Sequence, residues 1–493
     1  MIVGVDVGTS VTKARLIARD GRGGPMHSAR STVHHESGAR VEQDLDEVID
    51  TVINVVRAAA ADAERLGEPV EALALTGQGD GLWLRDADGQ AVGRAISWLD
   101  GRASDTLRRW TADGVARGVY TRTGSGMFPG CPGPLLAHLA EHEPERLARA
   151  DVAGYCVDAI VQRFTGERTV DASDASLPFL DVPARTYSDD ALALCGLGEQ
   201  RRLLVEPAQP GAMFALSLPA AELLGLPSGL PVSGGPFDIP SCGFGCGVGK
   251  PGDGNLIIGT TLGCQVLGER LEIDPASEPA GMWLATPYPD KFLRVMPAMV
   301  GTAGLDWLLQ VLGVRVDELD ELLAASPPGA NGVSALPFLS QSGERAPFVD
   351  SRARGQLTGL SVGSTRADLV RALCEAVAFS ARHCLDTLGH AGELSACGGG
   401  ARSREWSQVF ADVIGADLHI PDDEGVGVRG AAKIAWESLG RPVDADAWRA
   451  ERSTVHANPV NVEFYQREFE RYQQTLGAAR QSWETNPYPG AHP

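Results

Sequence analysis

The sequence predicts an α/β protein built from two related domains, and a repeated pattern leads to this prediction. An apolar strand, a tight turn of Gly with Thr or Ser, and a second apolar strand occur at residues 4–18 and again at residues 257–267. Glycine lets backbone N–H groups approach an anion closely, and the hydroxyl groups add further donors. Two such hairpins facing each other would clamp a polyphosphate, which indicates ATP chemistry between two related domains.

The order of the elements repeats as well. The expected elements of the first half are strands 2–7, 12–18 and about 29–34, a helix at about 44–66 with apolar residues at helical spacing, and a strand at 70–75. Those of the second half are strand–turn–strand 255–268, strand 293–297, helices 304–312 and 366–388, strand 394–397, helix 403–414, strand 417–420 and helix 428–439. Thr365 and Asp368 can form a capping box. This similarity indicates a diverged duplication at domain scale.

The Gly- and Pro-rich segment 233–252 marks the expected boundary between the domains. The first domain, 1–240, would bind the acceptor and carry the first phosphate loop. The second domain, 241–455, would bind the nucleotide. Residues 456–493 are expected to form one helix and a polar, Pro-containing tail that is partly disordered.

Composition excludes several classes of protein. Of the 493 residues, 43% are hydrophobic and 22% charged, which is ordinary for a soluble globular protein. The formal charge of -21 and the lack of a Lys/Arg cluster argue against nucleic-acid binding. A site for anionic ATP must therefore draw its positive potential from loop amides and helix N-termini.

Cysteine usage and charge distribution indicate a cytoplasmic protein. The nine cysteines are scattered without a C-x-x-C pair, so neither a metal nor a disulfide framework is expected. Charged residues interrupt every long apolar stretch, and the N-terminus carries Asp6 and Lys13 where a signal peptide needs an apolar block. No membrane partner is expected.

Four motifs in order resemble those of a known family. Asp6-x-Gly8-Thr9-Ser10-x-x-Lys13 and Gly259-Thr260-Thr261 are similar to its two phosphate motifs, residues 343–350 to its G-E-R-x-P-x-x-D loop, and residues 398–403 to its adenosine loop. The chain resembles the FGGY carbohydrate kinases over about residues 2–440. This resemblance implies two ribonuclease-H-like domains, as in actin and hexokinase, flanking a cleft.

The family's two signatures agree with this chain to different degrees. Residues 355–375 resemble the C-terminal signature closely. The N-terminal signature departs, because Leu135 and His138 stand where the family usually has a Lys and a Trp. Because of this departure, the substrate contacts of better-known family members are a weaker guide to the substrate residues of this chain.

Asp238 is the predicted catalytic residue. A hydroxyl that attacks a γ-phosphorus must lose its proton, and a carboxylate can accept it. Asp238 follows the Gly234-Gly235 turn, and the resemblance assigns the general-base role to the aspartate of this G-G-x-x-D pattern. Asp238 could also cap the following helix, and both roles are compatible.

The phosphate site is predicted around the two hairpins. Asp6 beside polyphosphate would need a cation, so Asp6 and Asp238 are expected to hold Mg²⁺ through water. Hydroxyls would donate to phosphate oxygens or serve turn bonding, and Lys13 would reach the terminal phosphate or stay a solvated strand residue. The predicted nucleotide and phosphate residues are Gly8, Thr9, Ser10, Lys13, Gly259, Thr260, Thr261, Gly399, Gly400 and Ser403. Gly399 and Gly400 could equally serve helix–sheet packing.

The acceptor site is predicted from two polar segments and a flat apolar wall. A polyol needs hydrogen-bonding groups and such a wall. The predicted substrate residues are Gln78, Gly79, Asp80, Trp98, Asp100, Arg102 and Asp238. Trp98 could instead be a core residue and Arg102 a surface ion pair. Glycerol kinases have Arg-Glu where this chain has Gly79-Asp80, so we expect room for a longer acceptor. Residues 77–81, 98–100 and 236–240 resemble the erythritol kinase branch.

The predicted function is ATP- and Mg²⁺-dependent phosphorylation of a terminal hydroxyl of a small polyol, with erythritol or threitol as first choice. A pentitol or ketopentose such as xylitol, xylulose or ribulose is the alternative acceptor. Two other classes stay open: an ATPase of the same superfold that moves a protein partner, and an inactive sugar sensor. The expected partners are a small polyol or sugar and, as one option for assembly, a second copy in a homodimer.

Overall fold

The computed structural model describes residues 1–37, 39–444, 447–448 and 452–485. The chain forms two compact units, and both are discontinuous in sequence. The first unit contains Met1–Gly247, Gly268–Leu293 and Gly425–Ala450. The second unit contains Val248–Leu267, Arg294–Glu424 and Glu451–Pro493. The domain limits expected from the sequence stay a prediction.

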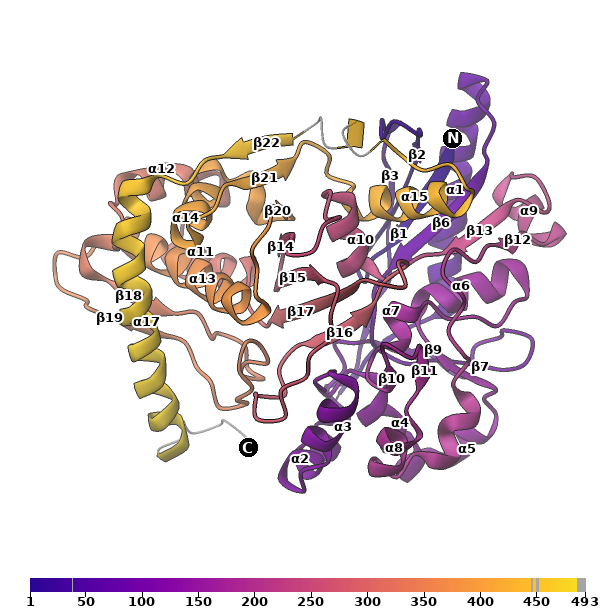
Figure 1. Cartoon of the computed structure of the whole chain (residues 1–493), viewed down its shortest axis with the longest axis horizontal. Helices are drawn as coiled ribbons and strands as arrows, with labels where there is room; N and C mark the ends of the chain where they lie inside the picture. The colour runs from indigo at the N-terminus through magenta and orange to yellow at the C-terminus, as the bar shows by residue number, and fades with distance from the viewer. Residues whose placement is uncertain (38, 445–446, 449–451, 486–493) are drawn as a thin grey trace. The chain divides into compact units, whose positions relative to one another are not determined.

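The first unit is built on a six-stranded sheet with the strand order β12-β13-β6-β1-β2-β3 (Figure 1). Its strands are β1 (Ile2–Val7), β2 (Val11–Ile17), β3 (His27–Arg30), β6 (Ala72–Gly77), β12 (Phe214–Ala215) and β13 (Pro231–Gly234). β1 runs antiparallel to β2, and both β1 and β13 run parallel to β6. The carboxyl ends of β1, β6 and β13 therefore lie at the same edge of the sheet.

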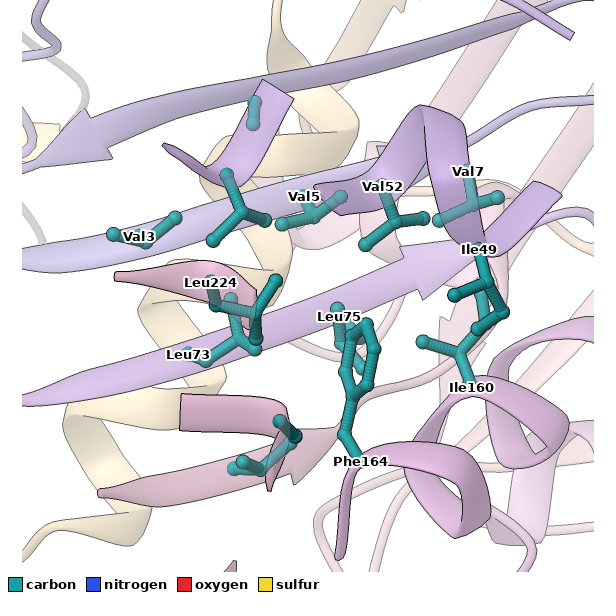
Figure 2. Packing of buried hydrophobic residues seen from close by; sticks show 14 of the residues in the cluster. Val3, Val5, Val7, Ile49, Val52, Leu73, Leu75, Ile160, Phe164 and Leu224 are labelled. Atoms are coloured by element: carbon teal, nitrogen blue, oxygen red, sulfur yellow. The ribbon is translucent and has the colours of Figure 1, made fainter. Parts of the chain in front are cut away.

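Alternation along β1 decides what covers each face of this sheet. Val3, Val5 and Val7 point to one face, where Figure 2 shows them packed with side chains of three helices. These helices are α1 (Leu45–Leu66), α6 (Cys156–Thr165) and α9 (Leu218–Leu224). Successive side chains of a strand point to opposite faces, so Ile2 lies in a separate cluster on the other side.

A helix from late in the chain covers this other face. α15 (Val426–Ser438), drawn in orange beside the indigo strands in Figure 1, packs Val428 and Ala432 into the cluster with Ile2. A Cβ on Gly4 would lie 2.6 Å from Cγ1 of Val428, so glycine in β1 allows this close packing. α10 (Asp238–Gly245) crosses α15 equally closely, because a Cβ on Gly430 would lie 1.9 Å from the carbonyl oxygen of Ser241.

The second unit repeats the order of strands. Its strands hydrogen-bond in the order β17-β15-β14-β20-β21-β22. They are β14 (Gly254–Ile258), β15 (Leu262–Gly268), β17 (Phe292–Ala298), β20 (Leu394–Cys397), β21 (Leu418–Pro421) and β22 (Arg452–Val455). As in the first unit, a hairpin's first strand runs parallel to a neighbour, β14 beside β20, and β20 runs parallel to β21. The repeated order expected from the sequence is confirmed.

The chain forms further helices and strands besides these. Further helices are α2 (Ser104–Ala112), α3 (Val115–Thr123), α4 (Pro132–His142), α5 (Pro144–Ala148), α7 (Ala172–Ala175), α8 (Asp189–Leu194), α11 (Thr302–Leu312), α12 (Leu319–Ala325), α13 (Arg366–Leu388), α14 (Arg404–Ile414) and α17 (Pro459–Thr485). Further strands are β4 (His34–His35), β5 (Val41–Gln43), β7 (Trp83–Arg85), β8 (Ala95–Ile96), β9 (Val152–Gly154), β10 (Leu180–Asp181), β11 (Thr186–Tyr187), β16 (Met282–Ala285), β18 (Ser334–Leu336) and β19 (Gln356–Thr358).

Local sequence signals set several boundaries correctly. α13 begins after Thr365, whose side chain and that of Asp368 form the expected capping box. The expected strand at 29–34 is wrong in its extent, because β3 ends at Arg30 and His34 starts β4 in a separate small sheet. Among the helices that the structure describes, none combines the length and apolar character of a membrane span. The tail expected after the last helix lies outside the described residues.

Candidate active site

Three carboxylates gather at the carboxyl edge of the first sheet. Asp6 lies near the end of β1, Asp80 follows β6, and Asp238 is the first residue of the helix after β13. Oγ1 of Thr76 lies 2.7 Å from the carbonyl oxygen of Pro236 and 2.9 Å from Oγ of Ser241, which ties the end of β6 to the start of α10. Ligand sites of α/β sheets typically lie outside this edge.

The environment of Asp238 suits a general base. Burial, together with the negative charges of Asp6 and Asp80, raises the pKa of Asp238 to about 7 against the hydrogen bond from the Ile239 N–H, which lowers it. A carboxyl group that titrates near neutral pH can accept a proton efficiently under ordinary conditions. Asp238 is the first residue of α10 and Phe237 is the N-cap residue, so Asp238 is not the helix cap considered as an alternative. A carboxylate in the first turn still interacts favourably with the helix dipole.

Asp6 has an oxygen atom available for a ligand. Burial raises its pKa, against the opposing charge of Lys13, which faces Asp6 across the β1–β2 ladder. Within the described residues, Oδ1 of Asp6 is buried and has no hydrogen-bond partner. Oδ2 faces the first turn of α15, since a Cβ on Gly427 would lie 2.9 Å from it.

This environment fits a hard cation. Mg²⁺ is typically bound by one or two carboxylates, several waters and phosphate oxygens. The unpartnered, buried oxygen of Asp6 belongs to this set of donors. The described residues contain no group of three or more His, Cys, Asp or Glu side chains that could hold a metal ion by themselves.

The predicted phosphate residues of the first hairpin loop differ from one another in exposure and hydrogen bonding. The N–H of Gly8 donates to the carbonyl oxygen of Val11 at 3.2 Å, and a Cβ on Gly8 would lie 2.8 Å from that oxygen. Ser10 is exposed at the tip of the turn. The Thr9 hydroxyl, by contrast, is engaged inside the first unit, where it donates to Oε1 of Gln78 at 3.0 Å.

The structure brings the loop after β6 and the Trp98 segment together. The N–H of Gly81 donates to the carbonyl oxygen of Gly130 at 3.0 Å. A Cβ on Gly130 would lie 1.9 Å from the carbonyl oxygen of Trp98, so only glycine fits there. Asp80 between these contacts has a φ of 54°, a left-handed conformation that is uncommon outside glycine. The polar loop and the aromatic wall therefore share one neighbourhood, as the sequence suggests.

The space beside Gly79 is filled. A Cβ on Gly79 would lie 2.6 Å from Cδ2 of Phe237, and Phe237 is buried next to Asp238. The room expected from the missing Arg at this position is thus occupied by an aromatic ring.

Asp100 and Arg102 form an internal ion pair. Asp100 accepts hydrogen bonds from the N–H of Val41 at 2.6 Å and from the Arg102 guanidinium at 2.9 Å. The same guanidinium donates to Glu42 at 2.6 Å, and its side chain is only 2% exposed. Arg102 is therefore not in the surface ion pair considered as an alternative, and a contact of either residue with a substrate stays a prediction.

The second hairpin loop lies at the start of a helix in the second unit. The N–H of Gly301 donates to the carbonyl oxygen of Thr260 at 2.9 Å, and that of Thr302 to the carbonyl oxygen of Gly259 at 2.7 Å. Gly301 is the N-cap residue of α11. Thr260 is exposed and Thr261 half-buried, so their hydroxyls are within reach of solvent.

Three residues of the loop after β20 were predicted to bind the nucleotide, and their environments differ. A Cβ on Gly400 would lie 2.3 Å from Cγ2 of Ile258, so Gly400 serves close packing. Gly399 has open space where its Cβ would be. Ser403 accepts a hydrogen bond from the N–H of Trp406 at 3.0 Å, which caps α14, and donates to Asp320.

Sequence reasoning missed three residues of the first unit. Gln43 is fully buried and bonds to Gln78, Phe237 packs on Gly79, and Gly427 adjoins Asp6. A polar residue between the apolar Val41 and the helix cap Asp44 was the available signal for Gln43. Only their neighbours in the fold reveal Phe237 and Gly427.

Two sheets of the same strand order, each with a glycine-rich hairpin loop, define the two-domain ATPase fold of actin and hexokinase, here in a phosphotransferase that acts on a sugar or polyol. Models of the FGGY family of carbohydrate kinases match this chain, the N-terminal domain at residues 1–245 and the C-terminal domain at residues 254–438. The chain belongs to the FGGY family of carbohydrate kinases.

Individual relatives agree with this assignment. The chain is 33% identical over 458 residues to an erythritol kinase of Brucella abortus (strain 2308), covering 89% of this chain and 88% of the relative. A xylulose kinase structure from Rhodospirillum rubrum superimposes with a TM-score of 0.88 at 27% identity, covering 98% and 99% of the two chains. A Plasmodium falciparum glycerol kinase determined with ADP shares the fold, with a TM-score of 0.84 at 17% identity over 97% and 98%.

Proposed function

We propose that this kinase transfers the γ-phosphoryl group of ATP to a terminal hydroxyl of a small polyol, with Asp238 as the general base. One observation carries the proposal: a buried carboxyl group with a pKa of about 7 lies beside Asp6 and Asp80 at the carboxyl edge of the first sheet. In the proposed reaction, Asp238 accepts the proton of the attacking hydroxyl. The oxygen then forms its bond to the γ-phosphorus, and ADP leaves.

The residues of the first unit would bind and orient the acceptor. Asp80 and Trp98 supply a hydrogen-bonding group and a flat wall, and Phe237 closes the space beside Gly79. Mg²⁺, for which the unpartnered oxygen of Asp6 is the proposed ligand through water, would neutralise charge on the phosphates when bound.

The residues of the second unit would bind the nucleotide. The exposed Thr260 and the half-buried Thr261 offer hydroxyl donors to phosphate oxygens. Open space at Gly399 leaves backbone accessible to a ribose or a flat ring. The ADP found with the Plasmodium falciparum glycerol kinase supports an adenine nucleotide as the donor.

A four-carbon polyol is the proposed acceptor. The 33% identity to an erythritol kinase over most of both chains supports it. A pentitol or ketopentose is the second candidate, which the likeness to a xylulose kinase of Rhodospirillum rubrum favours.

The test is ADP release from ATP and Mg²⁺ across glycerol, the tetritols, the pentitols and the common ketoses, with Asp238→Asn as the inactive control. We expect one strong responder among the tetritols and none in the control. A strong response to a ketose alone would replace the acceptor but keep the kinase. Steady ATP hydrolysis that no acceptor stimulates would instead favour an ATPase that moves a protein partner.

A further inference from the structure

Four hydrogen bonds connect the first hairpin loop to the acceptor side of the first unit. The Thr9 hydroxyl donates to Oε1 of Gln78 at 3.0 Å, and Nε2 of Gln78 donates to Oε1 of Gln43 at 2.8 Å. Nε2 of Gln43 then donates to the carbonyl oxygen of Thr9 at 3.1 Å, which closes a ring of three residues. The indole Nε1–H of Trp98 donates to the same Thr9 hydroxyl at 2.9 Å. We name Thr9, Gln43, Gln78 and Trp98 the Thr9 ring.

The hydrogen-bond donors and acceptors in the Thr9 ring are largely engaged with one another. A threonine hydroxyl has one proton to donate, and Thr9 donates it to Gln78 while accepting from Trp98. The Gln78 amide gives one N–H to Gln43 and lies 3.8 Å from Sγ of Cys156. Gln43 is fully buried and Gln78 is 3% exposed, so water does not readily replace a lost partner.

This bonding changes the expected role of two residues. For Thr9 to donate to a phosphate oxygen, it would have to release Gln78. For Gln78 to bind an acceptor hydroxyl with its amide N–H groups, it would have to release Gln43. Trp98 is half-buried, and its indole Nε1–H is hydrogen-bonded to Thr9. This hydrogen bond fixes the orientation of the flat face of the indole.

We propose that Gln43 and Thr9 are positioning residues for the acceptor site, which hold Trp98 and the loop after β6 in the orientation that binds the acceptor. This inference rests on the proposed kinase function. Neither residue needs to touch the acceptor. Their effect passes through Trp98 and through Gln78, which directly precedes Gly79 and Asp80.

The test compares four variants of the full-length enzyme with the acceptor identified by the panel above. Thr9→Val keeps the shape of the side chain but removes the hydroxyl, Thr9→Ser keeps the hydroxyl, and Gln43→Met removes the amide. Thr12→Val is the matched control, because Thr12 lies in the same hairpin with a buried hydroxyl that contacts Ser31 and Thr51 at 3.2 and 3.0 Å, outside the Thr9 ring.

We expect Thr9→Val and Gln43→Met to raise the acceptor KM by about tenfold while the ATP KM changes by less than about twofold. Thr9→Ser should remain close to wild type, and Thr12→Val should leave both constants unchanged. A double variant that combines Thr9→Val with Gln43→Met should lose little more acceptor affinity than either single variant, because both substitutions act on one connected group of hydrogen bonds. A raised ATP KM in Thr9→Val with an unchanged acceptor KM would assign Thr9 to the phosphates and overturn the inference.

A second measurement guards against variants that fold poorly. Calorimetry measures acceptor binding to Trp98→Phe in the absence of nucleotide. This variant tests the indole contact alone, because phenylalanine keeps an aromatic wall without the N–H. Weaker acceptor binding by about tenfold supports the Thr9 ring, and wild-type binding overturns its role. If the wild-type enzyme responds to no acceptor, the proposed function fails and the inference fails with it. Normal wild-type kinetics with unaffected variants refute the inference alone.

Discussion

The aromatic ring of Phe237 occupies the position into which a side chain at Gly79 would extend: a Cβ on Gly79 would lie 2.6 Å from Cδ2 and 2.8 Å from Cγ of that ring. Phe237 directly precedes the proposed base Asp238, and its N–H donates to Oγ of Ser173 at 3.3 Å. Gly79 in the loop after β6 and Phe237 before the proposed base therefore restrain each other, although they are 158 positions apart in the sequence.

This contact predicts that Gly79→Ala lowers kcat/KM by about 10- to 100-fold, because displacement of Phe237 shifts Asp238 away from the attacking hydroxyl. Steady-state kinetics with the best acceptor measure the loss. Phe237→Leu in the same chain should recover part of it by making room. Gly198→Ala is the matched control, since a Cβ there meets nothing within 4 Å. Wild-type kinetics in Gly79→Ala would show that the Phe237 ring can move aside without affecting catalysis, and would contradict this prediction.

The pKa of Asp238, about 7, predicts a pH dependence of the reaction. The base must be ionised to accept a proton, so kcat/KM for the acceptor should rise with pH and level off above about pH 7. Asp238→Asn should be inactive at every pH while its affinity for ATP stays within about twofold of wild type. A pH profile that is flat between pH 5 and 8, or measurable turnover by Asp238→Asn, would remove Asp238 from this role.

Asp6 and Asp80 should differ in the ligand they affect. Asp6→Asn should raise the Mg²⁺ concentration for half-maximal rate by about tenfold or more, because it weakens a proposed ligand of the cation. Asp80→Asn should instead raise the acceptor KM and leave the Mg²⁺ requirement unchanged. Titrations of Mg²⁺ and of acceptor on both variants separate the two roles. Equal effects of both substitutions on both titrations would contradict the division.

Glu344 predicts a pH-dependent stability in the second unit. Its Oε1 accepts hydrogen bonds from the N–H groups of Met299, Arg345 and Ala346 at 2.9, 2.9 and 3.3 Å. Burial nevertheless raises the pKa of Glu344 from 4.5 to about 7. The folded state therefore binds more protons than the unfolded state between about pH 4.5 and 7, and this contribution to stability falls as pH rises through that window.

Calorimetric unfolding at pH 5 and pH 8 tests this expectation. Glu344→Gln cannot titrate, so it should gain stability relative to wild type as pH rises, by at most about 3 kcal/mol. Glu344→Ala should be less stable at both pH values, since three N–H groups lose their acceptor. A difference between Glu344→Gln and wild type that does not change with pH would refute the raised pKa.

Local patterns were sufficient for many elements of the fold and for some elements of the site. The period-2 alternation of residues 2–7, the helical spacing of residues 45–66 and the capping box of Thr365 and Asp368 are short-range signals, and each element formed where expected. The Gly- and Thr-rich motifs likewise located the two hairpin loops, because tight turns require small residues, while the role of Asp238 stays a proposal. The strand expected at 29–34 failed because its second part pairs in a different sheet.

Other parts of the site depend on partners that are remote in sequence. Thr9 looked like a phosphate donor, but its hydroxyl is engaged by Gln78 and Trp98. For Arg102 the sequence left a surface ion pair open as an alternative, but its side chain is buried against Asp100 and Glu42. No local signal could reveal these pairings, because a hydrogen bond between distant residues depends on where packing places both of them.

The sequence by itself determined the family, the repeated strand order, and the positions of the hairpin loops and of the candidate base, since these follow from composition, periodicity and short motifs. Only the tertiary structure decided that α15 returns to cover β1, that Phe237 fills the space beside Gly79, and that Gln43 closes a ring with Thr9 and Gln78. The physical reason is that these contacts join segments far apart along the chain, so side-chain volume and buried hydrogen bonding select them rather than local backbone preference.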